Sequence, residues 1–520
     1  MADTASIPFG RAWWKEAIVY QIYPASFVDS NGDGIGDLNG IASKLDYLKD
    51  LGVDVLWLSP IYKSPLADMG YDISDYRDID PRYGTLEDWD NLLKGVHERG
   101  MKLISLMIHT SMIGFKNPAR ARQTQNETGT FGGLRSSVWE FDEATQEYYL
   151  HLYLPQQPDL NWNNPELRDA VWDMMKFWLD RGCDGFRMDV INLISKAEGL
   201  PDAPIIAPGE PYQPAGALFA NGPHVHKYIQ EMNAKVLSKY DIMTVGETPF
   251  THDPSLLAPY VLPRNKELDM VFHFEIIRVD TPRIGNDHIQ LAFKPWKLTE
   301  FKEIITRWQQ YKRDEGFWNA TYLENHDHAR SVSRFGNDSD QWRMLSAKLL
   351  AMLQVMQSGT QYVYQGQELG LKNFPRSWGL EEYKDVATQN YWNKILKQRK
   401  AGSDKEVDME DILDDFAKKA RDHARVPMQW DSSPNAGFTA GTPWMRVNED
   451  YRTWNAENQI GDGASILEFW KRLLKLRKSN LTLAPRRFLD IFAVLEILVG
   501  QYDSEVGKRY VLERKQELVN

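Results

Sequence analysis

Cysteine is almost absent, since the 520-residue chain contains only Cys183. A lone cysteine excludes an internal disulfide, and scarce cysteine is typical of proteins from a reducing compartment. In an apolar run such a residue is expected to be a small buried side chain rather than a nucleophile. We therefore expect a cytoplasmic protein that is stabilised by its core.

Long apolar runs and clustered basic charge are missing as well. Residues 1–20 have no apolar segment behind a basic cluster, and no stretch reaches about 18 apolar residues, so we expect neither a signal peptide nor a membrane span. The formal net charge is −12, and no dense Lys/Arg stripe offers a surface for a phosphate backbone. These absences argue against membrane and nucleic-acid partners, and we expect a monomer that binds a small molecule.

Aromatic residues, in contrast, are abundant. The chain has 18 Trp, 23 Tyr and 21 Phe, and aromatic faces combined with carboxylates suit the apolar faces and hydroxyl rims of sugars. Large cores also collect aromatic residues, so composition alone favours a carbohydrate ligand only weakly.

Short apolar runs alternate with stretches that have the apolar spacing of helices. Three of these stretches, 38–52, 85–100 and 165–182, close on a glycine, as helices often do. Eight alternating units predict an α/β protein with a closed (β/α)8 TIM barrel, and a doubly wound open sheet is the alternative. The eight runs are 17–24, 53–60, 101–109, 184–190, 241–247, 270–275, 319–327 and 359–368.

Two segments interrupt or follow the alternation. About fifty residues after the third run have little helical periodicity, and we expect a shortened subdomain inserted there, over the barrel mouth. About forty residues follow the last helix, too few for an ordinary β-sandwich, so they should pack on the barrel or be poorly ordered. The expected division is 10–109 and 161–479 for the barrel, 110–160 for the insert, and 480–520 for the remnant of a C-terminal β domain.

Five of the predicted strands carry a carboxylate at or next to the carboxyl end, including Glu275 and Glu368, and the three that matter most are Asp189, Glu247 and Asp327. In a TIM barrel such ends converge on the face where chemistry takes place. Glycoside hydrolysis needs two carboxyl groups flanking one bond, about 5–5.5 Å apart when configuration is retained. The three positions therefore predict a glycosidase site.

The surroundings of the carboxylates suggest different roles. In an extended strand Arg187 and Asp189 share a face, opposite Val190, and the guanidinium would keep Asp189 ionised as a nucleophile. Glu247 follows apolar residues with no basic neighbour, so burial should raise its pKa toward that of a general acid. Asp327, beside His326, could bind sugar hydroxyls. For Arg187 and Asp189, a structural ion pair is the alternative.

A loop after the first strand, "DSNGDGIGD", resembles a calcium-binding loop. It lacks the Glu that would complete an EF-hand, so we expect a structural Ca²⁺, with Mg²⁺ possible, or else a metal-free Asx/Gly turn. The expected ligands are the side chains of Asp29, Asn31, Asp33 and Asp37 and the carbonyl of Ile35.

The motifs "WWKEAIVYQIYPASF", "DMGYDISDY", "QPDLNW", "DGFRMDV", "TVGE", "ENHD", "YQGQE" and "RDHARVPMQW" together resemble the α-amylase-type glycoside hydrolases of family 13. The similarity is to the α-glucosidases and oligo-1,6-glucosidases and runs from about Trp13 to Lys478. It implies a retaining α-glucosidase in which Asp189 is the nucleophile, Glu247 the acid/base and Asp327 the transition-state stabiliser. The implied glucose-binding residues are Asp68, Tyr71, His109, Arg187, His326 and Arg425, with Tyr153 where the family often has Phe.

The resemblance also bears on linkage. Val190, directly after the implied nucleophile, is similar to enzymes that favour α-1,6 linkages, so isomaltose-type substrates are expected. Maltase or sucrase-type α-1,4 specificity and glucosyl transfer are the alternatives. The segment "RVDTPRIGNDHIQ" does not reproduce the Arg/Asp-rich loop of sucrose-isomerising relatives, which favours hydrolysis.

The chain departs from the family in three places. The third strand, "SLMIHTS", is two residues short of the usual pattern, which puts in doubt whether His109, though implied as a ligand, reaches the glucose site. The inserted subdomain and the C-terminal segment are also shortened. A catalytically impaired sugar-binding relative, or a gene model with mis-spliced segments, is therefore the alternative from another class.

Overall fold

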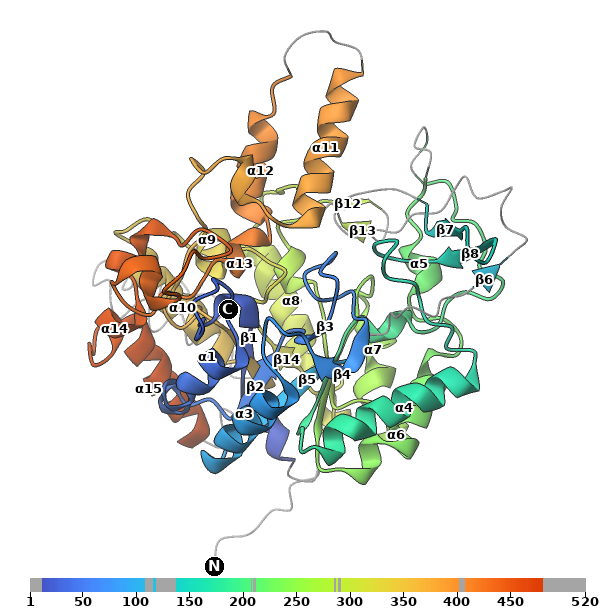
Figure 1. Ribbon diagram of the computed structural model, residues 1–520, viewed down its shortest axis with the longest axis horizontal. Helices are drawn as coiled ribbons and strands as arrows, with labels where there is room; N and C mark the ends of the chain where they lie inside the picture. Colours follow the sequence, from blue (N-terminus) through green and yellow to red (C-terminus); the bar gives the residue numbers. More distant parts are fainter. Residues whose placement is uncertain are drawn as a thin grey trace, which may run out of the picture.

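Eight parallel strands close into a barrel at the centre of the molecule (Figure 1). The computed structural model describes residues 12–107, 116–117, 137–206, 208, 212–284, 287–288, 291–401 and 407–479. The strands are, in barrel order, β11 (Met270–Phe272), β10 (Met243–Glu247), β9 (Gly185–Met188), β5 (Lys102–Met107), β2 (Val55–Leu58), β1 (Ile18–Ile22), β15 (Thr360–Tyr364) and β14 (Ala320–Thr321). A parallel bridge between Val271 and Asn319 joins β11 to β14 and closes the ring. The predicted TIM barrel is confirmed, and each strand lies within its predicted run.

The strands are apolar because both of their faces are covered. Every residue of β1, β2, β10 and β15 is buried, either in the barrel interior or against the outer helices. Fully covered parallel strands need continuous apolar runs rather than alternation. Cys183, just before β9, is one of these buried residues, and burial raises the pKa of its thiol to about 12.

The outer helices begin and end where local chemistry predicts. In α3 (Leu86–Glu98) the side chain of Thr85 accepts from the amide of Asp88, whose carboxylate accepts from the amide of Thr85. Helix α2 (Leu45–Leu51) ends at Gly52, whose φ of 103° is the left-handed conformation that glycine adopts without strain. The other long helices around the barrel are α4 (Pro165–Asp180), α6 (Val225–Lys235), α7 (Pro254–Val261), α8 (Leu298–Gln310), α10 (Arg343–Val355) and α15 (Ile466–Ser479).

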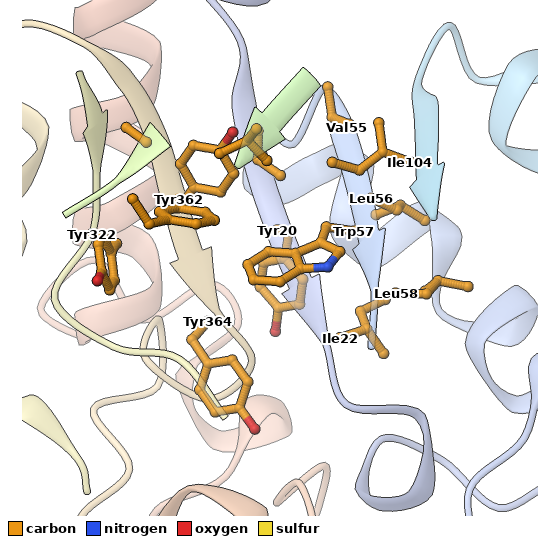
Figure 2. Close-up of a cluster of buried hydrophobic side chains, with 14 of the residues drawn as sticks. Tyr20, Ile22, Val55, Leu56, Trp57, Leu58, Ile104, Tyr322, Tyr362 and Tyr364 are labelled. Atoms are coloured by element: carbon orange, nitrogen blue, oxygen red, sulfur yellow. The ribbon is translucent and has the colours of Figure 1, made fainter. Parts of the chain in front are cut away.

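The barrel interior is filled by aromatic side chains. Trp57 of β2 stacks on Phe272 of β11 with ring centroids 5.5 Å apart, and Tyr362 of β15 meets Phe272 edge-on at 4.7 Å. Figure 2 shows Trp57 and Tyr362 pointing into this interior, with Tyr322 beside them. The aromatic abundance of the chain thus serves the core, on which the site rests.

Two attachments extend the barrel (Figure 1). After β5, the strands β6 (Lys116–Asn117), β8 (Glu147–Leu150) and β7 (Trp139–Asp142) form a small antiparallel sheet in the region where an insert was predicted. Helices α11 (Val386–Lys400) and α12 (Glu410–Lys419) project together and share a second apolar cluster with Phe374 and Trp378. Residues 480–520 and most of 108–136 lie outside the described residues, so the domain boundaries stay predictions.

Truncating the central ring of the interior should destabilise the fold strongly. We expect Phe272→Ala to lower the free energy of unfolding by about 3–5 kcal/mol, because Trp57 and Tyr362 lose their shared contact and a cavity remains. Denaturant unfolding measures the change. The control Leu256→Ala removes a side chain of α7 that is 51% exposed and should shift the midpoint little; equal effects would contradict the packing described here.

Candidate active site

A pocket opens at the carboxyl end of the barrel strands. Its empty space, counted together with the solvent at its mouth, is about 410 Å³. The predicted carboxylates Asp189, Glu247 and Asp327 all line it. The other lining residues are Asp68, Tyr71, Tyr153, Gln157, Val190 and Arg421.

One guanidinium joins two of the carboxylates. Arg187, on β9 and 1% exposed, binds Asp189 through Nη1 and Glu247 through Nη2, the latter at 2.5 Å. The prediction that Arg187 faces Asp189 is correct but incomplete, because the sequence offered no sign of the second bond, to the neighbouring strand β10. Two carboxyl groups held by the two ends of one guanidinium must lie close together.

Glu247 is the carboxyl group whose proton affinity is most useful for catalysis. Burial raises its pKa to about 8, and the nearby charges of Asp189 and Asp327 act in the same direction, while Arg187 opposes them. At neutral pH Glu247 is therefore mainly protonated. The direction matches the expectation from its apolar approach along the strand.

Asp327 has the opposite electrostatic environment. Burial alone would raise its pKa, but His326 and the guanidinium groups of Arg421 and Arg425 outweigh burial and hold the pKa well below its usual range. Both arginines bind Asp327 Oδ1 at 3.1 Å. Asp327 therefore stays ionised throughout the neutral range.

Tyr71 lines the pocket, and the fully buried His326 packs against its ring. Their rings stack with centroids 5.5 Å apart, and the Tyr71 hydroxyl contacts His326 Nε2. On the other side of the ring, the amide nitrogen of Gln21 lies 2.7 Å from Nδ1. Burial lowers the pKa of His326 to about 3, so its imidazole is neutral.

Asp68 lines the pocket together with two residues that contact it. Gln157 Nε2 donates to Asp68 Oδ2 at 3.0 Å, and Arg421 Nη2 lies 3.7 Å from the other oxygen. Burial raises the pKa of Asp68 to about 6, against the effect of Arg421. Tyr153 lines the pocket nearby, as predicted.

Sequence reasoning missed three residues of this site, namely Arg421, Asp385 and Gln157. Asp385 is fully buried and accepts from Arg421 at 2.6 Å and from Arg425 at 2.7 Å, so it holds the two arginines against Asp327. The motif "RDHAR" contained a signal for Arg421, because residues four apart on one helical turn lie on the same side. For Asp385 the only signal in the sequence was the pattern of a helix N-cap, and Asp385 does cap α11.

Val190 was expected on the face of β9 opposite Asp189, and this expectation is wrong. The strand ends at Met188, and Val190 has a φ of 35°, so the alternation of faces stops before it. Its side chain joins the pocket, and its amide lies 3.4 Å from Glu247 Oε2. His109, the remaining predicted ligand, lies outside the described residues, so its position stays a prediction.

The predicted calcium loop folds around its own backbone. The carboxylate of Asp29 accepts from the amides of Asn31, Gly32 and Gly34, and Asp37 accepts from Ser30 and Gly40. The side chains of Asn31 and Asp33 accept from the amides of Asp33 and Ile35 in the same way.

Oxygen donors of this kind suit Ca²⁺. In the parts of the chain that the structure covers, no group of three His, Cys, Asp or Glu side chains is placed to hold a metal ion, although the predicted ligands also include Asn31 and the carbonyl of Ile35. The metal stays a prediction that melting with and without a chelator would decide.

Comparison with known proteins assigns the family. The family model described as the catalytic domain of alpha amylase matches residues 21–485. The chain belongs to the alpha-amylase family. It is a glycoside hydrolase, like the curated members it matches.

Individual members of the alpha-amylase family are similar over most of their length. An oligo-1,6-glucosidase of Parageobacillus thermoglucosidasius is 49% identical, covering 90% of this chain and 84% of the relative, and an α-glucosidase of Schizosaccharomyces pombe is 48% identical over 90% and 83%. Among solved structures, the isomaltulose synthase of Protaminobacter rubrum has a TM-score of 0.84 at 38% identity, covering 92% of this chain and 86% of its own. The trehalose-6-phosphate hydrolase of Bacillus licheniformis has a TM-score of 0.82 at 39%, covering 91% and 85%.

None of the helices in the described ranges is both long and apolar enough to pass through a membrane.

The raised pKa of Glu247 should be visible in stability. A carboxyl group whose pKa is about 8 in the folded protein and about 4.3 when unfolded makes the fold less stable as pH rises between those values. We expect Glu247→Gln to remove this loss, so that its unfolding free energy, relative to wild type, improves from pH 5 to pH 8. The control Glu98→Gln, on the exposed face of α3, should show no such trend; the same pH dependence in both variants would contradict the assignment.

Proposed function

We propose that the protein is a retaining α-glucosidase that releases terminal α-linked glucose from short oligosaccharides, with a preference for α-1,6 linkages. The observation that carries the proposal is the pair of carboxyl groups, Asp189 and Glu247, bound to one guanidinium in the pocket. Inverting glycosidases separate their carboxyl groups by about 6.5–9.5 Å to admit water, whereas retaining enzymes keep them at about 5–5.5 Å. A shared guanidinium favours the shorter spacing.

In this proposal Asp189 and Glu247 divide the chemistry. The Asp189 carboxylate attacks the anomeric carbon while Glu247 gives its proton to the departing glycosidic oxygen, which leaves as the second sugar. A glucosyl ester of Asp189 remains, and Glu247 is now a carboxylate. Water then displaces Asp189 from the glucosyl carbon and passes a proton to Glu247, which releases glucose in the α configuration and restores both groups.

The other side chains would bind one glucose unit at the end of its chain. Asp327, kept ionised by two arginines, can accept hydrogen bonds from sugar hydroxyls and stabilise positive charge that develops on the ring. Asp68, Gln157 and Arg421 line the same pocket and can bind hydroxyls of that glucose. Removal of terminal units is supported by the similarity to curated α-glucosidases and oligo-1,6-glucosidases.

The α-1,6 preference rests on Val190 and on similarity to oligo-1,6-glucosidases. Maltase or sucrase-type α-1,4 hydrolysis is the alternative, supported by the α-glucosidase of Schizosaccharomyces pombe. Glucosyl transfer is a further alternative, because isomaltulose and trehalulose synthases share the fold at 38% identity. An impaired sugar-binding relative is less well supported, since the pocket contains all three carboxylates in distinct electrostatic settings.

The acid role of Glu247 predicts a pH profile. We expect kcat/KM to fall above pH 8, because Glu247 has a pKa of about 8 and donates a proton only below it. Glu247→Gln should lower kcat on isomaltose by about 10²–10⁴-fold and remove the alkaline limb. Glu98→Gln serves as the control and should keep both rate and limb; an unchanged limb in Glu247→Gln would show that another group titrates.

The linkage preference is tested at residue 190. We expect isomaltose to be hydrolysed with a higher kcat/KM than maltose, and Val190→Thr to shift the ratio of the two toward maltose by about tenfold or less, since one side chain shapes only part of a pocket. Ile191→Val, at the next position but outside the pocket lining, is the matched control. Faster maltose turnover by the wild type would reject the preference, and release of the β-anomer would reject retention.

A further inference from the structure

Helix α10 carries a row of apolar side chains on the face that points away from the barrel. Trp342, at its N-cap, Leu345 and Leu349 are 46%, 57% and 45% exposed, and the half-buried Met352 and Met356 continue the row. These residues are three or four positions apart, so they share one face of the helix. The opposite face is buried against the core. We refer to the five side chains as the outer strip.

An apolar outer face is unusual for a helix on the surface of a barrel. Such a helix normally has polar residues toward water, and a helix that is apolar on both faces is normally covered on both. Ten large apolar side chains are exposed in the described part of the chain, and three of them belong to the outer strip. Elsewhere on the long barrel helices they occur singly, as Leu256, Leu298 and Leu476. Scattered single residues are ordinary, whereas a continuous strip indicates a contact surface.

The described part of the chain ends beside this strip. Helices α10 and α15 pack against each other on one flank of the barrel (Figure 1). In the last turn of α15, Arg477 Nη1 donates to the carbonyls of Val355 and Gln357 at 2.5 and 2.8 Å. The final turns of the two helices therefore lie together, and α15 ends two residues later, at Ser479. The chain that follows leaves next to Met356, the last member of the outer strip.

The sequence that follows contains a matching apolar segment. Residues 488–499 read "FLDIFAVLEILV", in which ten of the twelve residues are apolar and only Asp490 and Glu496 are charged. The eight residues 480–487 that connect it to α15 span at most about 26–29 Å when extended. The outer strip, from residue 342 to residue 356, is about 21 Å long. The segment is therefore long enough and close enough to reach every part of the strip.

A second copy of the chain fits the strip less well. A stable interface between two proteins buries about 800 Å² on each partner. The outer strip is one helix wide, about 10 Å, and so offers on the order of 200 Å². A segment that is already tethered to α15 needs far less area, because the tether gives it an effective concentration in the millimolar range.

We propose that residues 488–499 pack on the outer strip of α10 and cover it. The contact removes two apolar surfaces from water at once, which is the main source of its stability. It also ties the segment to the helix that leads into β15, so that the wall of the barrel and the residues after α15 support each other. The occupant is a part of this chain rather than a separate protein.

Thiol labelling of the full chain tests the proposal. The native Cys183 is buried and burial raises its pKa to about 12, so it gives almost no background. We expect Leu349→Cys to react with a maleimide at least about tenfold more slowly than Leu256→Cys, because a covered thiol reacts only when the segment lifts away. Leu256 is 51% exposed on α7 and is the matched control. In denaturant the two thiols should react at the same rate.

A second pair of variants shows which residues provide the cover. Ile491→Glu with Leu495→Glu, introduced into the Leu349→Cys chain, should restore fast labelling, because each carboxylate opposes burial of the segment. Ser504→Glu with Gln516→Glu adds the same charge at polar positions beyond the segment and should leave the labelling slow.

Each other outcome overturns the proposal. If Leu349→Cys reacts as fast as Leu256→Cys, the strip is open to solvent and the segment does not cover it. If labelling is slow but Ile491→Glu with Leu495→Glu leaves it slow, something else covers the strip. Labelling that slows as the protein concentration rises, together with earlier elution in gel filtration, would identify a second copy as that cover.

Discussion

The guanidinium of Arg187 is the group on which the site depends. It is buried at the end of β9 and binds two carboxyl groups that, without it, would repel each other in a medium of low dielectric constant. Burial opposes the charge on Arg187, but Glu247 and Asp189 outweigh burial and raise its pKa above the ordinary value. The same burial favours the proton on Glu247. One cation thus allows two acidic groups to lie side by side, one of which, Glu247, keeps its proton.

Across the pocket, two carboxyl groups, Asp327 and Glu247, are held in opposite protonation states. Asp327 is bound by Arg421 and Arg425 and stays ionised, whereas burial raises the pKa of Glu247 against the charge of Arg187 and keeps it protonated. Asp385 makes this asymmetry possible because it neutralises and positions both arginines from a fully buried place at the start of α11. The pocket therefore has a proton donor, Glu247, and a carboxylate that stays ionised, Asp327. This pair suits a reaction that passes through a cationic sugar ring.

Features set by residues close together along the chain were predictable from the sequence, whereas contacts between distant segments were not. The barrel was predictable because burial on both faces requires continuous apolar strands, and caps and glycines mark the helix ends. Asp189 and Glu247 were predictable because the first directly follows β9 and the second ends β10, whereas Asp327 lies beyond the end of β14 at Thr321 but within the predicted run 319–327. The bond from Arg187 to Glu247 was not, since it depends on the register of β9 against β10, which no pattern within either strand reveals. Arg421 binds Asp327 although it lies 94 positions away along the chain, and Asp385, 58 positions from Asp327, holds Arg421 there. Both contacts depend on how α11 and α13 (Asp422–Arg425) are placed relative to each other.

Val190 departs from the regular strand conformation at the point where the active site begins. A β-branched residue at a φ of 35° is rare, and such strain costs on the order of 1–3 kcal/mol. The surrounding contacts hold it there, because the amide of Asp189 donates to Met107 on the next strand and Glu247 lies against the amide of Val190. If the strand continued without this turn, the alternation of faces would direct Val190 to the far face of β9 and away from the pocket. The strained turn thus places Val190, the residue after Asp189, in the pocket lining, where it limits what can bind beside the carboxyl groups.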